Sequence, residues 1–316
     1  MGVSEFDWIE KYLKPIAKSA AAMGLSNDVA IVERKKTEAR LIASMDTLVE
    51  GVHFLAADPR YTVAQKLVRV NVSDILCKGA RPSQALLSIA VPDSMSEQNF
   101  ADFCGGLAVD LSRWEVALVG GDTVRTNGPL VLTLTIFGEC IAEGPANRSG
   151  AKPGDGVFVT GTIGAGVLGL ERAISGVEDH LSSHYRVPSI PPLEVADLVA
   201  RFATSSIDVS DGLVAEARHI SEASNVSTEL DLSCVPWAAA VGDSVDDMLH
   251  LATGGDDYQT LFTAGESVED SLRQEAERCG VNLTRIGVVR AGSDVALRFN
   301  ETLVPVPVVA GFNHSI

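Results

Sequence analysis

The sequence has few basic residues: 25 Lys and Arg stand against 42 Asp and Glu, and the formal net charge is −17. Nucleic acids and anionic membranes are bound through patches of Lys and Arg. The charge balance therefore argues against either one as a partner. An anionic ligand would need metal ions or local basic residues to offset the charge, and Lys78, Arg125, Arg148 and Lys152 lie beside the relevant loops.

Cysteine is also scarce, and its pattern excludes two kinds of site. The five cysteines are scattered, odd in number and never spaced C-x-x-C, which argues against a zinc site and fits a reducing cytoplasm. No G-x-S-x-G elbow occurs, so a serine hydrolase is not expected. No P-loop Gly-Lys-Ser/Thr ending occurs either.

Long apolar runs are missing as well. Glu5, Asp7 and Glu10 interrupt any signal-like stretch at the N-terminus. No segment approaches the ~18 apolar residues of a membrane span. We therefore expect a cytoplasmic protein without a membrane partner.

The length of 316 residues favours two domains. Turn residues are dense at 143–145 and 152–156, which places the boundary between domains 1–145 and 146–316. Strand and helix patterns alternate in both halves, which predicts an α/β or α+β fold. The expected helices are 5–23, 62–79, 96–113 and 211–223; the expected strands are 29–32, 39–45, 83–91, 116–119, 130–141, 157–160, 206–209, 258–263, 284–289 and 295–299.

Short acidic clusters set among Gly, Ser and Asn are the most informative feature that is present. Each lies beside an apolar strand or helix pattern, where loop residues converge on a site. Carboxylates brought together repel one another unless a cation lies between them, and oxygen ligands favour Mg²⁺. Because Mg²⁺ in such sites usually accompanies a phosphate, the pattern predicts a Mg-nucleotide enzyme. The clusters are 26–28, 44–47, 71–74, 120–123, 207–211 and 254–257.

Each cluster also has a structural interpretation when taken alone. Asn71, Asp74 and Lys78 share one face of a predicted helix, either as a functional face or as a solvated one with an Asp74–Lys78 pair. Gly120–Thr123 after its strand is either a ligand-contacting loop or a plain turn. Asp208–Gly212 is either a site at a strand end, with Asp211 opening the next helix, or a simple N-cap.

Two further features are less specific. Gly161–Gly166 is a strand-to-helix turn that either contacts phosphates or is merely tight. His53 lies in a loop, where a lone histidine is more often structural or solvated than catalytic.

Taken in order, these motifs resemble the thiamine-monophosphate kinase family of an ATP-binding superfamily that also contains aminoimidazole ribonucleotide synthetase, selenophosphate synthetase and a hydrogenase maturation factor. The resemblance runs from about residue 5 to the C-terminus. It depends on the segments 46–54, 70–75, 120–123, 148–155, 207–213, 254–258 and 311–314.

The resemblance implies an N-terminal mixed sheet that forms a dimeric barrel, a C-terminal α/β domain, and a homodimer. It implies ATP-dependent phosphorylation of thiamine monophosphate to thiamine diphosphate by direct in-line transfer, with Asp122, Asp208 and Asp211 as the catalytic residues. The implied Mg²⁺ ligands are Asp28, Ser44, Met45, Asp46, Asp74, Asp122, Asp208 and Asp211; the ATP contacts are Gly121, Asp122, Arg148 and Ser210; the substrate contacts are His53, Asp256 and Phe312.

The chain departs from the family pattern at several positions. Asn27 replaces a carboxylate, Met45 replaces Thr, and Asp256 and Gln259 replace Glu. Two alternatives therefore stay open: a non-catalytic nucleotide-binding homologue, or another synthetase of the superfamily.

Overall fold

A computed structural model describes residues 8–19, 34, 38–242, 244–308 and 311. The chain divides into two compact units. Unit 1 comprises Met1–Ile75 with Arg81–Cys140, and unit 2 comprises Leu76–Ala80 with Ile141–Ile316.

Unit 1 contains one four-stranded sheet with two long helices. Its described elements are η1 (Ile9–Leu13), β1 (Leu41–Val49), α2 (Arg60–Leu76), β2 (Ala80–Pro92), α3 (Glu97–Arg113), β3 (Ala117–Thr126) and β4 (Val131–Cys140). The strand order is β1-β4-β2-β3, so β1 and β3 are the two edges. Strands β1 and β4 run antiparallel from Leu41↔Glu139 to Val49↔Val131, whereas β2 and β3 are parallel.

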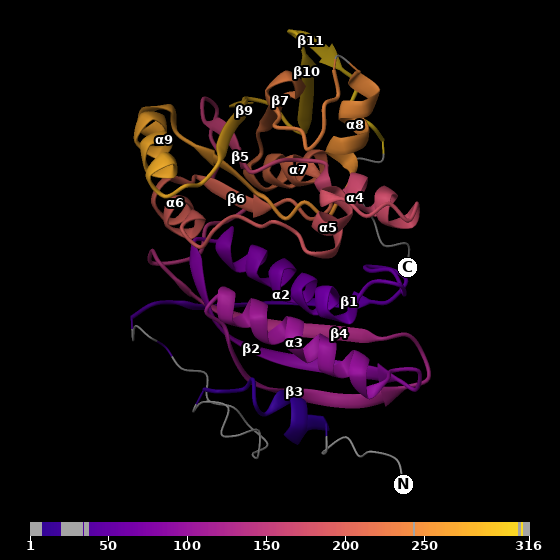
Figure 1. Ribbon diagram of the computed structural model, residues 1–316. Helices are drawn as coiled ribbons and strands as arrows, with labels where there is room; N and C mark the ends of the chain where they lie inside the picture. Colours follow the sequence, from indigo (N-terminus) through magenta and orange to yellow (C-terminus); the bar gives the residue numbers. More distant parts are fainter. Residues whose placement is uncertain (1–7, 20–33, 35–37, 243, 309–310, 312–316) are drawn as a thin grey trace. The chain divides into compact units, whose positions relative to one another are not determined.

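Helices α2 and α3 lie over one face of this sheet (Figure 1). A Cβ on Gly138 of β4 would lie 2.4 Å from Ile75 Cγ2, so the glycine permits the close approach of α2. Between the helices, the buried carboxylate of Asp110 accepts hydrogen bonds from Gln65 Nε2 at 2.9 Å and Arg69 Nη2 at 3.2 Å. Arg69 and Asp110 thus compensate each other's charge, which would be costly to bury alone.

Unit 2 contains a seven-stranded sheet in the order β11-β10-β7-β9-β5-β8-β6. Neighbouring strands in this sheet run antiparallel, except for β10 and β7, which are parallel. The elements are β5 (Gly156–Thr160), α4 (Ala165–Ile174), α5 (His180–Arg186), α6 (Val195–Phe202), β6 (Ser205–Asp208), α7 (Leu213–Ser224), β7 (Ser227–Asp231), η3 (Leu232–Cys234), α8 (Val245–Thr253), β8 (Thr260–Ala264), η4 (Glu266–Val268), α9 (Glu269–Arg278), β9 (Leu283–Arg290), β10 (Val295–Phe299) and β11 (Thr302–Val304).

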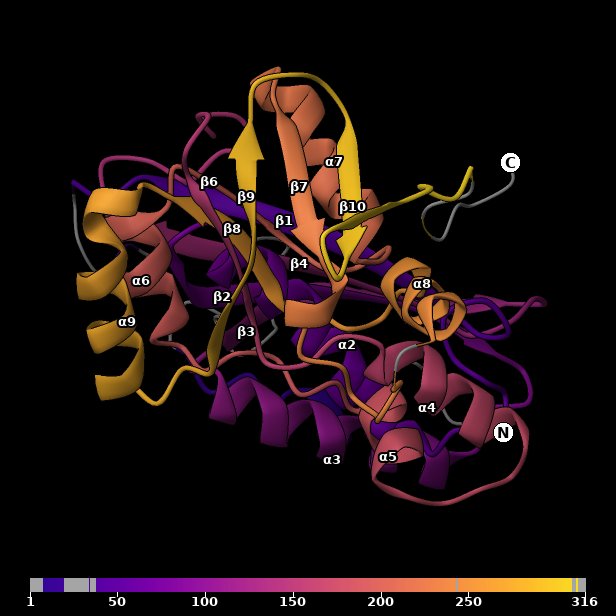
Figure 2. The same cartoon turned by 90° about the horizontal axis from the view of Figure 1, so that it is seen from above.

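Side chains from both faces of this sheet are buried. Val157, Val159 and Leu261 belong to a core that also contains apolar residues of α7 and α8. The alternate residues Phe158 and Phe262 stack with ring centroids 5.7 Å apart, beneath Arg273 of α9. Helices α6 and α9 lie side by side in both views (Figures 1 and 2). Because successive side chains point to opposite faces of a strand, the same strands contribute to the buried layers on both sides of the sheet.

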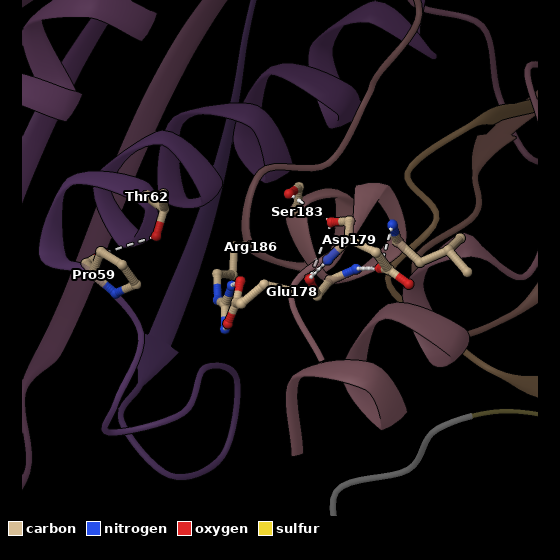
Figure 3. Close-up of polar contacts among 8 residues, drawn as sticks. Pro59, Thr62, Glu178, Asp179, Ser183 and Arg186 are labelled. Atoms are coloured by element: carbon tan, nitrogen blue, oxygen red, sulfur yellow. Dashed lines mark hydrogen bonds and ion pairs between the residues drawn. The ribbon is translucent and has the colours of Figure 1, made fainter. Parts of the chain in front are cut away.

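Local capping signals explain several helix ends. Ser96 caps α3 by accepting from the amide of Asn99 at 3.1 Å, at the start of the helix expected at 96–113. Asp179 forms a capping box with Ser182 at the start of α5, and Glu178 pairs with Arg186 (Figure 3). The hydroxyl of Thr62 donates to the Pro59 carbonyl at 2.8 Å in the first turn of α2 (Figure 3).

The mixed α/β, two-domain fold expected from the sequence is confirmed. The segment 29–32, expected as a strand, lies outside the described residues, and of the helix expected at 5–23 only the short η1 is described. None of the helices in the described part of the chain is long and apolar enough to cross a membrane.

Candidate active site

In unit 1, β1 and α2 bring two carboxylates together. Ser44 and Asp46 share one face of β1, and Met45 on the other face is 63% exposed. The Ser44 hydroxyl donates to the carboxylate of Asp74 on α2. Asn71, one turn earlier on α2, accepts from the Asp46 amide at 3.0 Å, and this bond anchors the edge strand to the helix. Ser44 and Met45 therefore lie in a strand, as the expected strand 39–45 implies, and this strand continues to Val49.

The electrostatics of this pair oppose the full ionisation of both carboxylates. Burial, followed by the neighbouring charge of Asp74 and a hydrogen bond to it, raises the pKa of Asp46 to about 7. Two close carboxylates are stable together when they share a proton or hold a cation. Oxygen donors of this kind suit Mg²⁺, which takes one or two carboxylates and completes its shell with water and phosphate oxygens.

Asp28, the third carboxylate that the family resemblance adds, lies outside the described residues. Among the residues that the structure does describe, no group of three or more His, Cys, Asp or Glu side chains is placed to hold a metal ion. Asp46 and Asp74 are thus two carboxylates without a third such group beside them in the described part of the chain.

The Gly120–Thr123 segment is not a turn, as one interpretation of the sequence had it, but part of β3. A register shift opposite Ala85 and Leu86 inserts Val119 as an extra residue in β3. A Cβ on Gly121 would lie 1.8 Å from the Leu87 carbonyl oxygen, so only glycine permits this approach of the two strands. The sequence analysis predicted a strand at 116–119 but missed its continuation to Thr126, because that continuation depends on pairing with the neighbouring β2.

Asp122 is not brought to Asp46 within one chain. It is exposed and lies opposite Ser88, whose neighbours in β2, Leu87 and Ile89, are buried against the helix layer. Strands β4 and β2 separate β3 from β1, which corresponds to roughly 14 Å at the usual strand spacing.

In unit 2, Asp208 ends β6 and is 6% exposed. The next helix, α7, has Gly212 as its N-cap, with no side-chain cap hydrogen bond. The expectation that Asp211 opens or caps this helix is therefore wrong, and so is the simple N-cap interpretation. Asp211 lies in a short connection, Val209–Gly212, between strand and helix.

This connection is bonded through its backbone to the second acidic loop, Gly254–Tyr258. The amide of Asp256 donates to the Ser210 carbonyl at 2.9 Å, and that of Tyr258 donates to the Val209 carbonyl at 2.7 Å. A Cβ on Gly255 would lie 2.5 Å from Ser210 O, so the loops approach too closely for any other residue. Two motifs about 45 residues apart thus form one rigid cluster.

Asp256 and Tyr258 are both left-handed, with φ values of 70° and 51°. Strained residues of this kind persist where the surrounding structure fixes them. The Tyr258 hydroxyl donates to Asp256 Oδ1 at 2.8 Å, which orients this carboxylate.

Asp257 has a structural role that the sequence did not suggest. Its buried carboxylate accepts from the amides of Gly164 at 2.8 Å and Gly166 at 3.1 Å, at the start of α4. Burial raises its pKa to about 7, against the lowering effect of these amides. Because the Asp257 carboxylate already accepts the hydrogen bonds of these amides, the structure favours the tight-turn interpretation of Gly161–Gly166 over a phosphate cradle.

Gln259 is likewise structural. Its amide nitrogen donates to the Ser189 carbonyl at 2.7 Å and the Asp257 carbonyl at 3.2 Å. A carboxylate could not make these bonds unless protonated. This departure from the family pattern therefore has a local reason.

Glu216 on α7 is the main residue that the sequence reasoning missed. It is 3% exposed, and its Oε1 accepts from the Asp211 amide at 3.2 Å and the Ser210 hydroxyl at 3.4 Å. Burial raises its pKa to about 7, while Arg148 acts to lower it. One signal was available: Glu216 falls within the apolar stripe Leu213, Ala217 and Ile220, where a carboxylate is out of place.

The basic residues near these loops differ in placement. The carbonyl of Arg148 accepts from Ser224 Oγ at 3.3 Å, and its charge acts on Glu216. Lys78 lies beyond the end of α2, not on its face as expected, and its ammonium donates to the Ser206 carbonyl at 2.6 Å.

Two predicted substrate contacts remain. Nδ1 of His53 accepts from the Val49 amide at 3.0 Å, which gives the ring a structural role in the turn after β1. Phe312 lies outside the described residues. Its neighbour Gly311 is described, and a Cβ there would lie 2.8 Å from the Asp211 carbonyl oxygen.

Comparisons with known proteins place this architecture in a class. Residues 12–140 match the model of the AIR synthase related protein N-terminal domain, and residues 152–300 match that of the AIR synthase related protein C-terminal domain. The chain has the fold of that ATP-binding class, as the sequence motifs predict.

More similar relatives narrow the class. The thiamine-monophosphate kinase of Caulobacter vibrioides is 34% identical over 93% of this chain and 86% of its own length. The thiamine-monophosphate kinase from Stenotrophomonas maltophilia superimposes with a TM-score of 0.82 at 29% identity, covering 96% and 99% of the two chains. A structure described as AaThiL complexed with AMPPCP and TMP superimposes with a TM-score of 0.73 at 27% identity, covering 98% of each chain. The chain belongs to the thiamine-monophosphate kinase family.

Proposed function

We propose that this protein transfers the γ-phosphoryl group of ATP to the phosphate of thiamine monophosphate, giving thiamine diphosphate and ADP. The observation that carries the proposal is the full-length similarity to kinases of this name, including a relative bound to AMPPCP and TMP. The acidic clusters of this chain are of the kind such a reaction requires.

In this reaction an oxygen of the acceptor phosphate forms a bond to the γ-phosphorus while the bond from that phosphorus to the β-bridging oxygen breaks. The attacking oxygen is already anionic, so no strong protein base is needed. Bound Mg²⁺ would neutralise charge on the phosphates and align them. The protein's task is to hold cations and orient both substrates, which suits carboxylates fixed on strands, helices and bonded loops.

The residue roles follow the family resemblance, and the geometry supports some of them. Asp46 and Asp74 form a close carboxylate pair with Ser44, and Ser210 and Asp211 lie in a connection bonded to Asp256. We propose Asp122, Asp208 and Asp211 as catalytic; Asp28, Ser44, Met45, Asp46, Asp74, Asp122, Asp208 and Asp211 as the Mg²⁺ ligand set; Gly121, Asp122, Arg148 and Ser210 as ATP contacts; and His53, Asp256 and Phe312 as substrate contacts.

A homodimer is part of the proposal. Asp122 and Asp46 lie on opposite edges of one sheet, so a second copy whose β3 lies beside β1 would bring the two edge strands that carry them side by side. Met45 and Val124, 63% and 46% exposed, lie on the face without α2 and α3, where a second sheet could close a barrel. None of the five cysteines, all of which lie in the described part of the chain, forms a disulfide, and this fits a cytoplasmic location.

The dimer proposal has a direct test. Asp46→Asn and Asp122→Asn variants, each inactive alone, should regain about a quarter of wild-type activity when unfolded and refolded together, because half the dimers are mixed and one of their two sites is intact. No recovery, or a monomer in size-exclusion chromatography, would refute the shared site.

Substrate-dependent ADP release tests the reaction itself. A coupled assay with ATP, Mg²⁺ and thiamine monophosphate should give ADP and thiamine diphosphate in equal amounts. Omission of thiamine monophosphate should abolish the signal. Tight ATP binding without turnover would instead indicate a nucleotide-binding homologue that has lost catalysis.

A further inference from the structure

The buried carboxylate of Glu216 lies beneath the acidic connection Val209–Gly212. Glu216 belongs to α7, and its neighbours on the same side of the helix, Leu213 and Ala217, are buried in the core of unit 2. A charged side chain that is 3% exposed must be compensated by specific partners. Those partners indicate its role.

Three of the groups around Glu216 belong to the proposed nucleotide site. Its Oε1 accepts from the Asp211 amide at 3.2 Å and from the Ser210 hydroxyl at 3.4 Å. The positive charge of Arg148 acts on the same carboxylate. These groups come from two chain segments, and Glu216 joins them from a third.

The bonds to Glu216 complement those from the loop Gly254–Tyr258. Asp256 and Tyr258 bond to the carbonyl oxygens of Ser210 and Val209, whereas Glu216 takes the amide of Asp211 and the hydroxyl of Ser210. The connection is thus hydrogen-bonded through its carbonyl oxygens to the loop Gly254–Tyr258, and through an amide and a hydroxyl to Glu216. With its proton directed at Glu216, the Ser210 oxygen is left to face a ligand as an acceptor.

We propose that Glu216 is a positioning residue that sets the orientation of Ser210 and Asp211 for nucleotide binding. The inference rests on the proposed function and assigns this residue a part in it. A bond from the carboxylate to the amide of Asp211 limits the rotation of that residue. The backbone of the connection is then already ordered when the nucleotide arrives, which lowers the entropy cost of binding.

A purely structural role is the alternative, since a glutamate in the first turn also stabilises a helix N-terminus. The two roles differ in what a substitution changes. A helix cap affects the unfolding temperature alone, whereas a positioning residue affects the affinity for nucleotide beyond any effect on stability.

The test compares Glu216→Gln with Glu216→Met in the full-length protein. Gln keeps an acceptor oxygen at the same reach, and Met keeps the volume without the acceptor. We expect Glu216→Met to weaken binding of AMPPCP with Mg²⁺ by about tenfold or more in calorimetry, and Glu216→Gln by no more than about threefold. In kinetics, the Glu216→Met defect should appear in KM for ATP, with KM for thiamine monophosphate nearly unchanged.

Ser221→Ala is the matched control. Ser221 is a fully buried residue of the same helix that donates to the Ala217 carbonyl at 2.9 Å and to Thr228 Oγ1 at 2.7 Å, away from the acidic connection. Its removal should lower the unfolding temperature and leave AMPPCP affinity unchanged.

Three outcomes would overturn the inference: Glu216→Met binding AMPPCP like wild type, Glu216→Gln losing as much affinity as Glu216→Met, or Ser221→Ala losing affinity to the same degree. A wild-type protein that binds AMPPCP without phosphorylating thiamine monophosphate would refute the proposed reaction. The affinity comparison would still decide the role of Glu216.

Discussion

The two acidic regions of this protein are built in different ways. In unit 1, Asp46 and Asp74 project from a strand and a helix, and burial together with the neighbouring charge of Asp74 raises the pKa of Asp46 to about 7. In unit 2, the connection that carries Asp211 is bonded to Glu216, Asp256 and Tyr258. The first region brings two carboxylates together and would be stabilised by a shared proton or a cation, whereas hydrogen bonds within the protein organise the second.

The largest effect that would sharpen this comparison is expected at Asp208. Asp208→Asn keeps the shape of the side chain and removes a proposed metal ligand, so kcat should fall by about 100-fold or more. Asp155→Asn is the control, because Asp155 is also 6% exposed in unit 2 but bonds to Thr204 and the Lys152 amide. That variant should lose stability and keep its kcat; near-normal turnover of Asp208→Asn at saturating Mg²⁺ would contradict the assignment.

The second prediction concerns the cation requirement of unit 1. Mg²⁺ should stabilise the wild-type protein by about 3 kcal/mol at one hundred times its Kd, and Asp46→Asn should remove most of that gain. Without metal, the Asp46→Asn variant should be at least as stable as wild type, because the substitution removes the repulsion between the carboxylates of residues 46 and 74.

Thermal unfolding with and without Mg²⁺ measures both effects. Asp102→Asn, at an exposed position on α3, should respond to Mg²⁺ like wild type. If Asp46→Asn is markedly less stable than wild type without metal, the pair is not a strained cation site.

The third prediction tests whether unit 2 organises itself. Asp257→Asn leaves a single acceptor oxygen for the amides of Gly164 and Gly166, so stability at neutral pH should fall by about 1–3 kcal/mol. The folded protein raises the pKa of Asp257 from an ordinary value near 4 to about 7, so it binds the proton more tightly than the unfolded chain does. This group's contribution therefore makes stability decrease as pH rises through that window.

Chemical denaturation between these pH values checks the sign. The variant should lose part of the downward slope that wild type shows from about pH 4 to about pH 7. An identical slope in both proteins would mean that Asp257 is ionised throughout this range in the folded state.

The smallest effect is expected at Tyr258. Tyr258→Phe removes the hydroxyl that donates to Asp256 at 2.8 Å, a loss of about 1 kcal/mol. KM for thiamine monophosphate should rise by about fivefold, with kcat and KM for ATP unchanged. A fall in kcat alone would show that Asp256 does not act in substrate binding.

Much of the fold could be predicted because its signals are local. The strand at 295–299 and the helix capped by Ser96 agree with the sequence expectation. The extent of β3 could not be predicted, because a bulge and the close approach of Gly121 to Leu87 depend on β2, some thirty residues away. Local periodicity carries no information about such a partner.

The sequence by itself determined the family and the order of the acidic motifs, because residue type and spacing carry these properties. Only the tertiary structure decided which carboxylates meet. It joined Asp46 to Asp74, left Asp122 at the far edge of the same sheet, assigned Asp257 to a helix N-terminus and placed Glu216 beneath Asp211. Distances between side chains remote in sequence depend on strand pairing and helix packing, which no single segment encodes.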